Sequence, residues 1–403
     1  MKTIELTDYV SAEAALRSSE LKQALYNEGA VLMQDVLVTL HGDAHRSRRH
    51  SEMRVFRRDF FKHYEHSVLP QVFAQVMAQT DTASALNLVD LNYRFMVYLA
   101  LQFAGIDRQS GTVEELLSLI ETLRMFGVAA TLGQAKDPSD AAQTSARVMA
   151  VMDQFDVQFF TPSVERRQRL LAQVTAGELS AQDLPRDVLT VLLEDATQLD
   201  MARDQVLRET GFFFLASAHT SVHSLGHAVH HLLHWCNQHP QARAHLESDA
   251  VLLQQFVHES FRLHPSSPIA KREALSRVEF LDGQIAEVGD TVIINLRQAN
   301  RDPEVFGQDP QSFNPMRLVR RGTSRTGVTF GIGMHACLGK NLAAGSAPDQ
   351  ANGASQNHQM GTVAWICQQL LKAGVAQDTA GTARLDQSIA RETWQHLPVT
   401  FTA

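Results

Sequence analysis

The stretch Thr329–Ala343, TFGIGMHACLGKNLA, decides how we interpret the fold of this chain. It holds three glycines, one histidine and one cysteine, Cys337, just before residues that favour a helix. Three kinds of site have this composition: a phosphate-binding loop, a buried structural cysteine, and a thiolate that binds a metal.

The first two alternatives explain the stretch poorly. Gly331, Gly333 and Ala336 match a relaxed dinucleotide-binding pattern, but the helix, strand and acidic residue that this pattern requires do not follow. A free cysteine most often packs as a small buried hydrophobe. That interpretation leaves the glycines on either side of Cys337 without a purpose.

A thiolate ligand accounts for every residue of the stretch. Backbone N–H groups at the start of a helix stabilise a thiolate over a thiol. Gly333 and Gly339 would let the backbone approach a flat cofactor closely, because no Cβ intervenes. Phe330 can cover the sulfur, and His335 can reach a carboxylate at the cofactor's edge.

This order of phenylalanine, glycine, histidine, cysteine and glycine resembles the haem-binding loop of the cytochrome P450 family. The resemblance implies haem b (iron protoporphyrin IX) as the cofactor and Cys337 as its proximal thiolate ligand. It also implies a soluble, bacterial-type enzyme.

A second motif upstream supports the resemblance. In HESFRLHP, Glu259 and Arg262 lie three residues apart, so they share one helix face and can pair. This pair resembles the family's Glu-x-x-Arg motif, and FNPMR offers Arg317 where the family has a further arginine. The resemblance implies a structural role for all three residues, holding the loop that carries the thiolate.

Four donors resemble the family's ligands of the haem propionates: His45 and Arg49 in HRSRR, Arg272 in AKREA, and His335. Together they would pair with two carboxylates. The matches run in family order from His45 to Gly339, so we expect one domain over residues 1–403.

The fold class follows from the patterns along the chain. Of the 403 residues, 44% are hydrophobic and 20% charged, as in an ordinary globular protein. Residues 113–132 and 249–264 repeat apolar positions with helical spacing, and a long helix is predicted from about Met201 to Trp235. Residues 278–296 predict two or three short antiparallel strands that turn at Asp282-Gly283 and Gly289-Asp290. We therefore predict a mainly α protein with a minor β region. The resemblance implies a triangular, helix-rich fold that holds haem between the long distal helix and the helix after the cysteine.

Two segments depart from the family pattern. His45 comes early in the chain, which predicts an N-terminal region that is short relative to the family, with a reduced sheet. Residues 344–361 are polar and without periodicity, which predicts a surface loop inserted into one helix.

The long helix carries the residues expected on the distal side. In FFFLASAHTSVHSL, Thr220 matches the family's threonine of oxygen activation, and His219 stands where an acid is usual. A histidine titrates near neutral pH, so His219 could relay protons, or it could turn outward. Apolar residues are expected to line the substrate pocket: Phe212, Leu215, Ala216, Ile269 and Ala270.

The same helix is rich in histidine: HTSVHSLGHAVHHLLHW imitates the histidine boxes that bind two irons in membrane desaturases. Those boxes come from separate segments of proteins with long apolar spans, whereas these crowd one helix. We expect instead a polar helix half that meets solvent or neighbouring helices, with cations near its C-terminus.

Composition also constrains partners and location. The net charge of −8 argues against nucleic acid. Three widely spaced cysteines form no disulfide framework, and the N-terminus has no signal peptide or membrane span, so we expect a cytoplasmic protein.

The resemblance implies a monooxygenase that inserts one oxygen atom of O2 into an apolar small molecule by hydroxylation or epoxidation. Electrons would come from an external ferredoxin or flavodoxin, and the basic run from Arg46 to Lys62 could contribute to docking it. Two alternatives stay open: a peroxide-driven peroxygenase or peroxide-rearranging enzyme, and a non-catalytic haem-binding recruitment protein.

Overall fold

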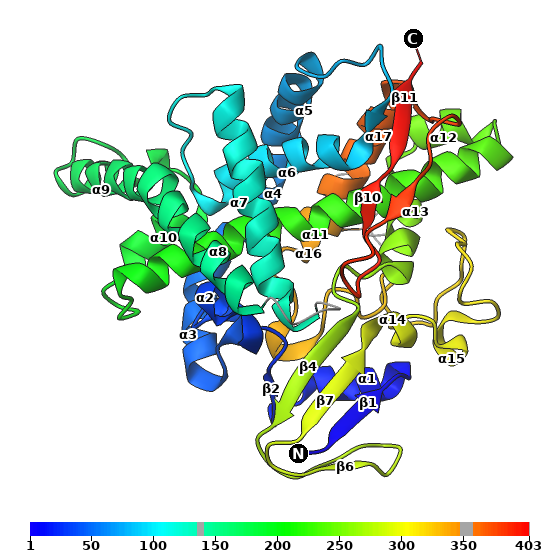
Figure 1. Ribbon diagram of the computed structural model, residues 1–403, viewed down its shortest axis with the longest axis horizontal. Helices are drawn as coiled ribbons and strands as arrows, with labels where there is room; N and C mark the ends of the chain where they lie inside the picture. Colours follow the sequence, from blue (N-terminus) through cyan, green and yellow to red (C-terminus); the bar gives the residue numbers. More distant parts are fainter. Residues whose placement is uncertain (135–140, 347–357, 403) are drawn as a thin grey trace. The chain divides into compact units, whose positions relative to one another are not determined.

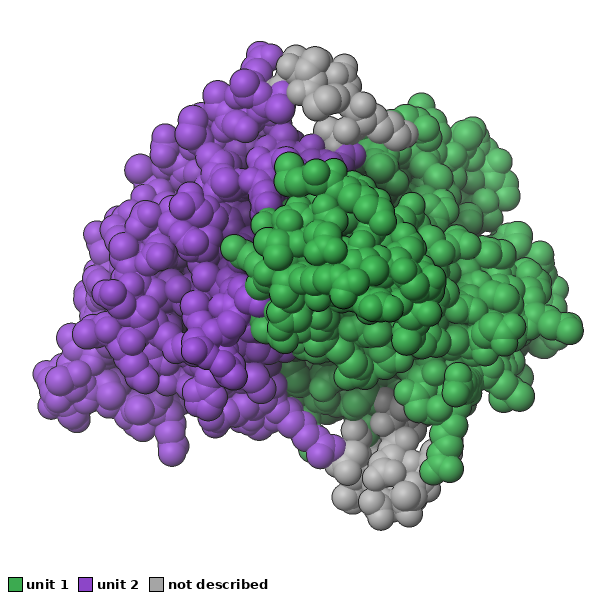
Figure 2. Space-filling model, turned by 90° about the horizontal axis from the view of Figure 1, so that it is seen from below, with its two compact units in different colours: residues 1–24, 61–92, 220–403 green, residues 25–60, 93–219 purple. Residues whose placement is uncertain are grey.

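The computed structural model describes residues 1–134, 141–346 and 358–402, which form two compact units. Unit 1 comprises residues 1–24, 61–92 and 220–403, and unit 2 comprises residues 25–60 and 93–219 (Figure 2). Helices dominate both units, and every strand of the described residues belongs to unit 1. The predicted mainly α class with a minor β region is confirmed. The single domain over 1–403 stays a prediction.

Unit 2 is helical around an aromatic core. The rings of Phe126 and Phe155 lie 5.3 Å apart between centroids, and Phe155 stacks on Phe214 at 6.1 Å. Such ring pairs add to the stabilisation that burial itself provides. Its helices are α2 (Ala30–Met33), α3 (Gly42–Glu52), α7 (Val113–Thr131), α8 (Ala141–Phe155), α9 (Thr161–Thr175) and α10 (Val188–Asp195), with parts of α4 (Arg58–His63), α6 (Leu88–Ala104) and α11 (Arg203–Gln238).

Helix α7 is the one helix of the described residues that has the length and composition of a membrane span. Together with the following turn, Val113–Gln134 is long and apolar enough to cross a membrane, although no span was predicted. More than half of its most apolar window, 56%, is buried inside the structure, where α7 packs against α2 and α8. Burial of this kind is what the core helix of a globular protein shows.

The main sheet of unit 1 has the strand order β1-β7-β4-β2, and α1 (Tyr9–Arg17) packs beside it (Figure 1). Strand β1 (Thr3–Leu6) runs parallel to β7 (Thr291–Asn295), whereas β4 (Ile269–Ala274) is antiparallel to both β7 and β2 (Leu21–Gln23). Alternation along β7 buries Val292 and Ile294 completely. The same alternation along β4 puts Ala270, Arg272 and Ala274 on the buried face.

The strands predicted within residues 278–296 are present. Strands β5 (Val278–Glu279) and β6 (Ile285–Ala286) are antiparallel and turn at Gly283, whose φ of +81° suits glycine. The third strand is β7, which leaves this hairpin at Gly289 and pairs with β4 and β1 in the main sheet. The three predicted strands are therefore confirmed, but they belong to two sheets.

Helix α11 runs from Arg203 to Gln238 and confirms the predicted long helix; from Thr220 onwards it belongs to unit 1. Short strands form two further small sheets: β3 (Leu86–Asn87) with β11 (Pro398–Phe401) and β8 (Val375–Gln377), and β9 (Arg384–Leu385) with β10 (Trp394–His396). The other helices are α5 (Leu69–Ala78), α12 (Ala242–Ser248), α13 (Ala250–Leu263), α14 (Leu296–Ala299), α15 (Pro303–Phe306), α16 (Lys340–Ala344) and α17 (Thr362–Lys372).

Helices α16 and α17 flank the polar segment 344–361, of which residues 347–357 lie outside the described part. Ser346 and Gln359 pair in an isolated antiparallel bridge that closes the base of the segment. The side-chain amide of Gln254 donates to the carbonyls of Ala344, Gln359 and Met360 at 2.7–3.1 Å. Both ends of the interruption are thus held by α13.

A buried carboxylate completes this junction. Glu65 accepts hydrogen bonds from the backbone N–H groups of Met360 and Gly361, at 3.1 and 3.0 Å, at the start of α17. A negative charge at a helix N-terminus is favourable because it satisfies donors that have no partner within the helix.

A strand, a helix and a second strand, β1, α1 and β2, precede His45. They supply two of the four strands in the main sheet, so this region contributes to the fold despite its length. That it is short relative to the family stays a prediction.

Candidate functional site

The cysteine loop is a closed turn in unit 1. The backbone N–H of Cys337 donates to the carbonyl of Phe330 at 2.8 Å, and the loop ends at Gly339, the residue before α16. The side chain of Cys337 is exposed, whereas Cys236 and Cys367 are buried. Burial raises the pKa of both buried thiols, which holds them protonated. Cys337 is therefore the cysteine best placed to act as a ligand.

Two of the loop's three glycines, Gly333 and Gly339, have protein neighbours in the structure. Gly333 has φ +72°, and a Cβ there would lie 2.8 Å from the carbonyl oxygen of Leu16 in α1. The backbone turn and the approach to α1 thus account for this glycine without a cofactor. A Cβ at Gly339 would lie 3.9 Å from the sulfur of Cys337, an ordinary contact distance. The ring of Phe330 packs edge-to-face on Phe261, 5.1 Å between centroids.

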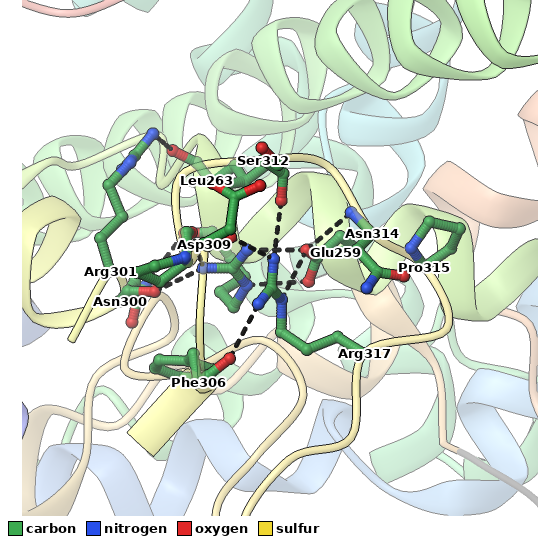
Figure 3. A network of polar contacts seen from close by, with 12 residues as sticks. Glu259, Leu263, Asn300, Arg301, Phe306, Asp309, Ser312, Asn314, Pro315 and Arg317 are labelled. Atoms are coloured by element: carbon green, nitrogen blue, oxygen red, sulfur yellow. Dashed lines mark hydrogen bonds and ion pairs between the residues drawn. The ribbon is translucent and has the colours of Figure 1, made fainter. Parts of the chain in front are cut away.

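The structure brings together the three residues predicted to hold the cysteine loop, Glu259, Arg262 and Arg317, which we call the latch; Figure 3 labels Glu259 and Arg317. Arg262 donates from Nε and Nη2 to the two oxygens of Glu259, at 2.8 and 2.6 Å. Arg317 donates from Nε to Oε1 of the same carboxylate at 3.1 Å. All three side chains are at most 5% exposed. This carboxylate is therefore the shared counter-charge of two guanidinium groups that are shielded from water.

The remaining guanidinium donors bind backbone carbonyls. Arg262 bonds the carbonyls of Asn300 and Pro310 at 2.6 and 2.8 Å. Arg317 bonds those of Phe306, Asp309 and Ser312 at 2.8–3.0 Å. The latch therefore fixes the course of the chain between α14 and the cysteine loop.

Asn300 connects the latch to the cysteine loop, a role that sequence reasoning missed. Its amide donates to the carbonyl of Arg262 at 3.0 Å and to the hydroxyl of Thr329 at 2.9 Å, and its oxygen accepts from the N–H of Val328 at 2.8 Å. A Cβ at Gly327 would lie 2.0 Å from that oxygen, so this position requires glycine. No pattern in the sequence marked this role, because its backbone partners Val328 and Arg262 lie 28 and 38 positions away.

Two of the four predicted propionate donors belong to unit 1. Arg272 is buried on β4 and donates from Nη1 to Oε1 of Gln23 at 2.7 Å, across the β4–β2 pair. Both ring nitrogens of His335 are shielded from solvent within the cysteine loop.

The other two donors lie four residues apart on α3, in unit 2. His45 is buried, and burial lowers the pKa of its imidazole to about 4, with a smaller effect from the charge of Arg49. Helix α3 is fixed by Arg48, which donates to the fully buried Glu209 of α11 at 2.5 Å. Glu209 also accepts from the N–H of Leu37.

Thr220 and His219 have different surroundings on α11. The carbonyl of Thr220 accepts a hydrogen bond from the hydroxyl of Ser266 at 3.0 Å, within unit 1. His219 belongs to unit 2, where its ring lies against Gly127 of α7. A Cβ at Gly127 would approach the His219 Nε2 to 2.4 Å. Gly127 thus makes room for the imidazole.

The predicted pocket residues divide between the units. Phe212, Leu215 and Ala216 lie on the unit 2 part of α11, where Leu215 is buried and the other two are half-buried. In unit 1, Ile269 is half-buried and Ala270 is buried on β4.

The histidines of α11 pack against neighbouring elements of unit 1. His227 stacks on His264 with ring centroids 4.1 Å apart, and its Nε2 lies 2.7 Å from the carbonyl oxygen of Glu392. His231 Nε2 lies 2.9 Å from His264 Nε2. Burial lowers the pKa of His227 to about 3 and also lowers that of His231, so both rings are neutral at pH 7. The expected packing is present, but the expected cations are wrong for these two rings. Within the described residues no cluster suited to a metal ion is found.

Known proteins resemble this chain in sequence. The sequence profile of the cytochrome P450 family matches residues 45–345, which include the latch and the cysteine loop. Cytochrome P450 105A3 of Streptomyces carbophilus is 38% identical over 107 residues, 26% of this chain and 24% of that protein. The monooxygenase PikC of Streptomyces venezuelae is 32% identical over 162 residues, 39% of this chain and 36% of PikC. The matched segments therefore span well under two thirds of these relatives.

Solved structures share the fold over nearly the whole chain. CalO2 superposes with a TM-score of 0.72 over 99% of this chain and 90% of its own, at 19% identity. P450BioI, solved in complex with an acyl carrier protein that bears hexadec-9Z-enoic acid, gives 0.75 over 99% and 92%, at 18% identity. The predicted fold is thus confirmed, and the family match extends over most of the chain: this protein belongs to the cytochrome P450 family.

Proposed function

We propose that the protein is a haem-thiolate monooxygenase that inserts one oxygen atom of O2 into an apolar small molecule. One observation carries the proposal: an exposed thiol, Cys337, stands on a loop joined to a buried Glu259–Arg262–Arg317 latch through Asn300. Such a loop is rigid enough to present a thiolate at a fixed place. The named monooxygenases among the relatives agree with this chemistry.

Membership of the family implies a haem cofactor, and we propose the b form. The donor set of this chain fits that group. Cys337 offers a thiolate, while Arg272 and His335 in unit 1, and His45 and Arg49 in unit 2, offer donors for carboxylates. When bound, a thiolate-ligated haem supplies O–O bond cleavage and oxygen transfer to substrate.

Thr220 is proposed to donate a hydrogen bond on the distal side, and His219 to move protons towards it. The support for His219 is its type and position, because an imidazole exchanges protons near neutral pH. Its ring lies against Gly127 of α7.

The chain's own residues favour an apolar substrate or substrate portion. Leu215 and Ala270 are buried, and Phe212, Ala216 and Ile269 are also apolar. Pockets with such linings bind ligands chiefly through apolar contact.

Electrons are proposed to come from an external ferredoxin or flavodoxin. The run from Arg46 to Lys62 presents exposed basic side chains, among them Arg57 and Arg58, to an acidic partner. We place the protein in the cytoplasm, without a membrane or nucleic-acid partner.

The thiolate is tested by the carbon monoxide difference spectrum of the reduced, haem-loaded protein. The wild type should show the red-shifted Soret band of a thiolate ligand, and Cys337→Ala should lose it. Cys236→Ala and Cys367→Ala are the matched controls, because their thiols are buried, and both should keep the band. A colourless protein, or an unchanged band in Cys337→Ala, contradicts the proposal.

Turnover separates the alternatives. Product with a ferredoxin system, and none with hydrogen peroxide alone, supports the monooxygenase. Product with peroxide alone supports a peroxygenase or peroxide-rearranging enzyme, and a thiolate band without any turnover supports a recruitment protein.

A further inference from the structure

A serine outside the motifs binds the backbone of the distal helix beside Thr220. Ser266 lies between α13 and β4, and its hydroxyl donates to the carbonyl of Thr220 at 3.0 Å. Its Oγ also lies 2.9 Å from the Oγ of Ser224, one turn further along α11. A hydroxyl carries a single proton, so the proton between the two serines must come from Ser224. The direction of these two hydrogen bonds is therefore fixed: Ser224 donates to Ser266, and Ser266 donates to Thr220.

Ser266 is itself held in place by the hairpin of β9 and β10. Arg391, which is buried, donates from Nη1 to the carbonyl of Ser266 at 3.0 Å. Two residues earlier, His264 lies 2.9 Å from His231 between their Nε2 atoms. The segment 264–266 therefore contacts α11 at four levels of the helix, at Thr220, Ser224, His227 and His231.

The bond to Thr220 acts on the geometry of one helical turn. In an α-helix the carbonyl of residue 220 is the acceptor for the N–H of residue 224. A second donor on such a carbonyl tilts it away from the helix axis, and serine or threonine hydroxyls at helices bend them in this way. Such a tilt changes the ψ angle of Thr220 and so shifts the turn that carries its side chain.

We propose that Ser266 is a positioning residue for Thr220: it fixes the carbonyl of that residue and so orients the side chain whose hydroxyl serves the distal reaction. The proposal rests on the proposed function of Thr220. It adds a residue that acts through the backbone, from a segment 46 positions along the chain.

The first test measures coupling, the amount of product formed per electron consumed, in the haem-loaded full-length protein. Ser266→Ala should lower coupling by about threefold to tenfold, the factor that the loss of one part-buried hydrogen bond produces. Ser266→Thr keeps the hydroxyl and should restore it. Ser163→Ala in unit 2 is the matched control: this fully buried serine also donates to a helix carbonyl, that of Phe159, and should leave coupling unchanged.

A double-mutant cycle tests whether Ser266 acts through Thr220. Thr220→Ala alone should lower coupling, and adding Ser266→Ala should lower it no further, because the positioned hydroxyl is already gone. If Ser266→Ala causes the same loss in both backgrounds, the positioning role is overturned.

Hydrogen exchange gives a readout that does not depend on turnover. Ser266→Ala should speed exchange of the amide of residue 224 by about tenfold, through easier opening of that turn. Unchanged exchange overturns the proposal even if coupling falls. Faster exchange with full coupling in Thr220→Ala would instead show that the turn is positioned as inferred, but that Thr220 lacks its proposed function.

Discussion

At the scale of single residues, one carboxylate holds much of unit 1 together. Glu259 accepts from Arg262, from Arg317 and from the backbone N–H of Asn314 at 3.1 Å. Arg262 is fully buried, so its charge depends on this partner. Removing one member of a buried ion pair leaves an uncompensated charge, which costs far more than an exposed pair contributes.

Glu259→Gln should therefore destabilise the protein strongly. The neutral amide keeps the shape of the carboxylate but leaves two guanidinium groups without a counter-charge, and a loss of about 3–5 kcal/mol is expected in urea unfolding. Glu13→Gln is the control, because its salt bridge with Arg17 is exposed and should contribute under about 1 kcal/mol. Equal effects of the two substitutions would contradict a buried latch.

At the scale of elements, side chains from other elements bind the backbone where α16 ends and just before α17 begins. The last carbonyls of α16 and the first N–H groups of α17 would lack helical partners where the two helices separate. Gln254 and His258 bind the carbonyl of Ala344, the last residue of α16, and Glu65 accepts from the N–H groups of Met360 and Gly361, just before α17. The first two lie on α13, and His258 Nε2 bonds the carbonyl of Ala344 at 2.8 Å.

Gln254→Ala should loosen this junction. Three backbone carbonyls lose a buried donor, so the free energy of unfolding should fall by about 1–3 kcal/mol. The change should concentrate in faster hydrogen exchange of residues 340–346 and 358–362. Gln173→Ala, at an exposed position of α9, is the control and should change stability by less than about 0.5 kcal/mol. A uniform rise in exchange over the whole chain would argue against a local clamp.

Motifs within one helix or one loop were readily predicted, whereas residues that join distant segments were not. Glu259 and Arg262 share a turn of α13, so their spacing alone indicated a pair. The cysteine loop was visible because its residues are consecutive. Asn300, Gln254 and Ser266 left no pattern, since a single polar residue bonds backbone groups 28 to 106 positions away. The contact of Gly333 with Leu16 of α1 was not predicted either, because α1 is far away in sequence.

At the scale of the whole molecule, buried neutral histidines link stability to pH. Burial lowers the pKa of His227 to about 3 and that of His258 to about 4. In the unfolded chain these rings titrate near about 6.5. Between those values the unfolded state binds more protons than the folded state, so stability falls as pH falls.

The protein should thus lose stability on acidification from about pH 6.5 towards pH 4, by about 1.4 kcal/mol per pH unit for each ring whose pKa is lowered this far. Urea midpoints at pH 7.5, 6 and 5 measure this loss. His258→Gln keeps a donor for Ala344 and should reduce the slope, whereas His50→Gln, at an exposed position, should leave it unchanged. A midpoint independent of pH in the wild type would contradict the assignment of neutral buried rings.

The bridge between Ser346 and Gln359 has a practical consequence for engineering. The two residues exchange both backbone hydrogen bonds, at 2.9 and 3.2 Å, so their Cα atoms are spaced as in a hairpin, about 5.5 Å apart. A fluorescent or affinity domain whose own termini lie that close could be inserted between the two residues. The hydrogen bonds of Gln254 and Glu65 to the backbone beside α16 and α17 would remain. The junction is therefore a suitable insertion site for attaching this enzyme to a support or to a fused reductase.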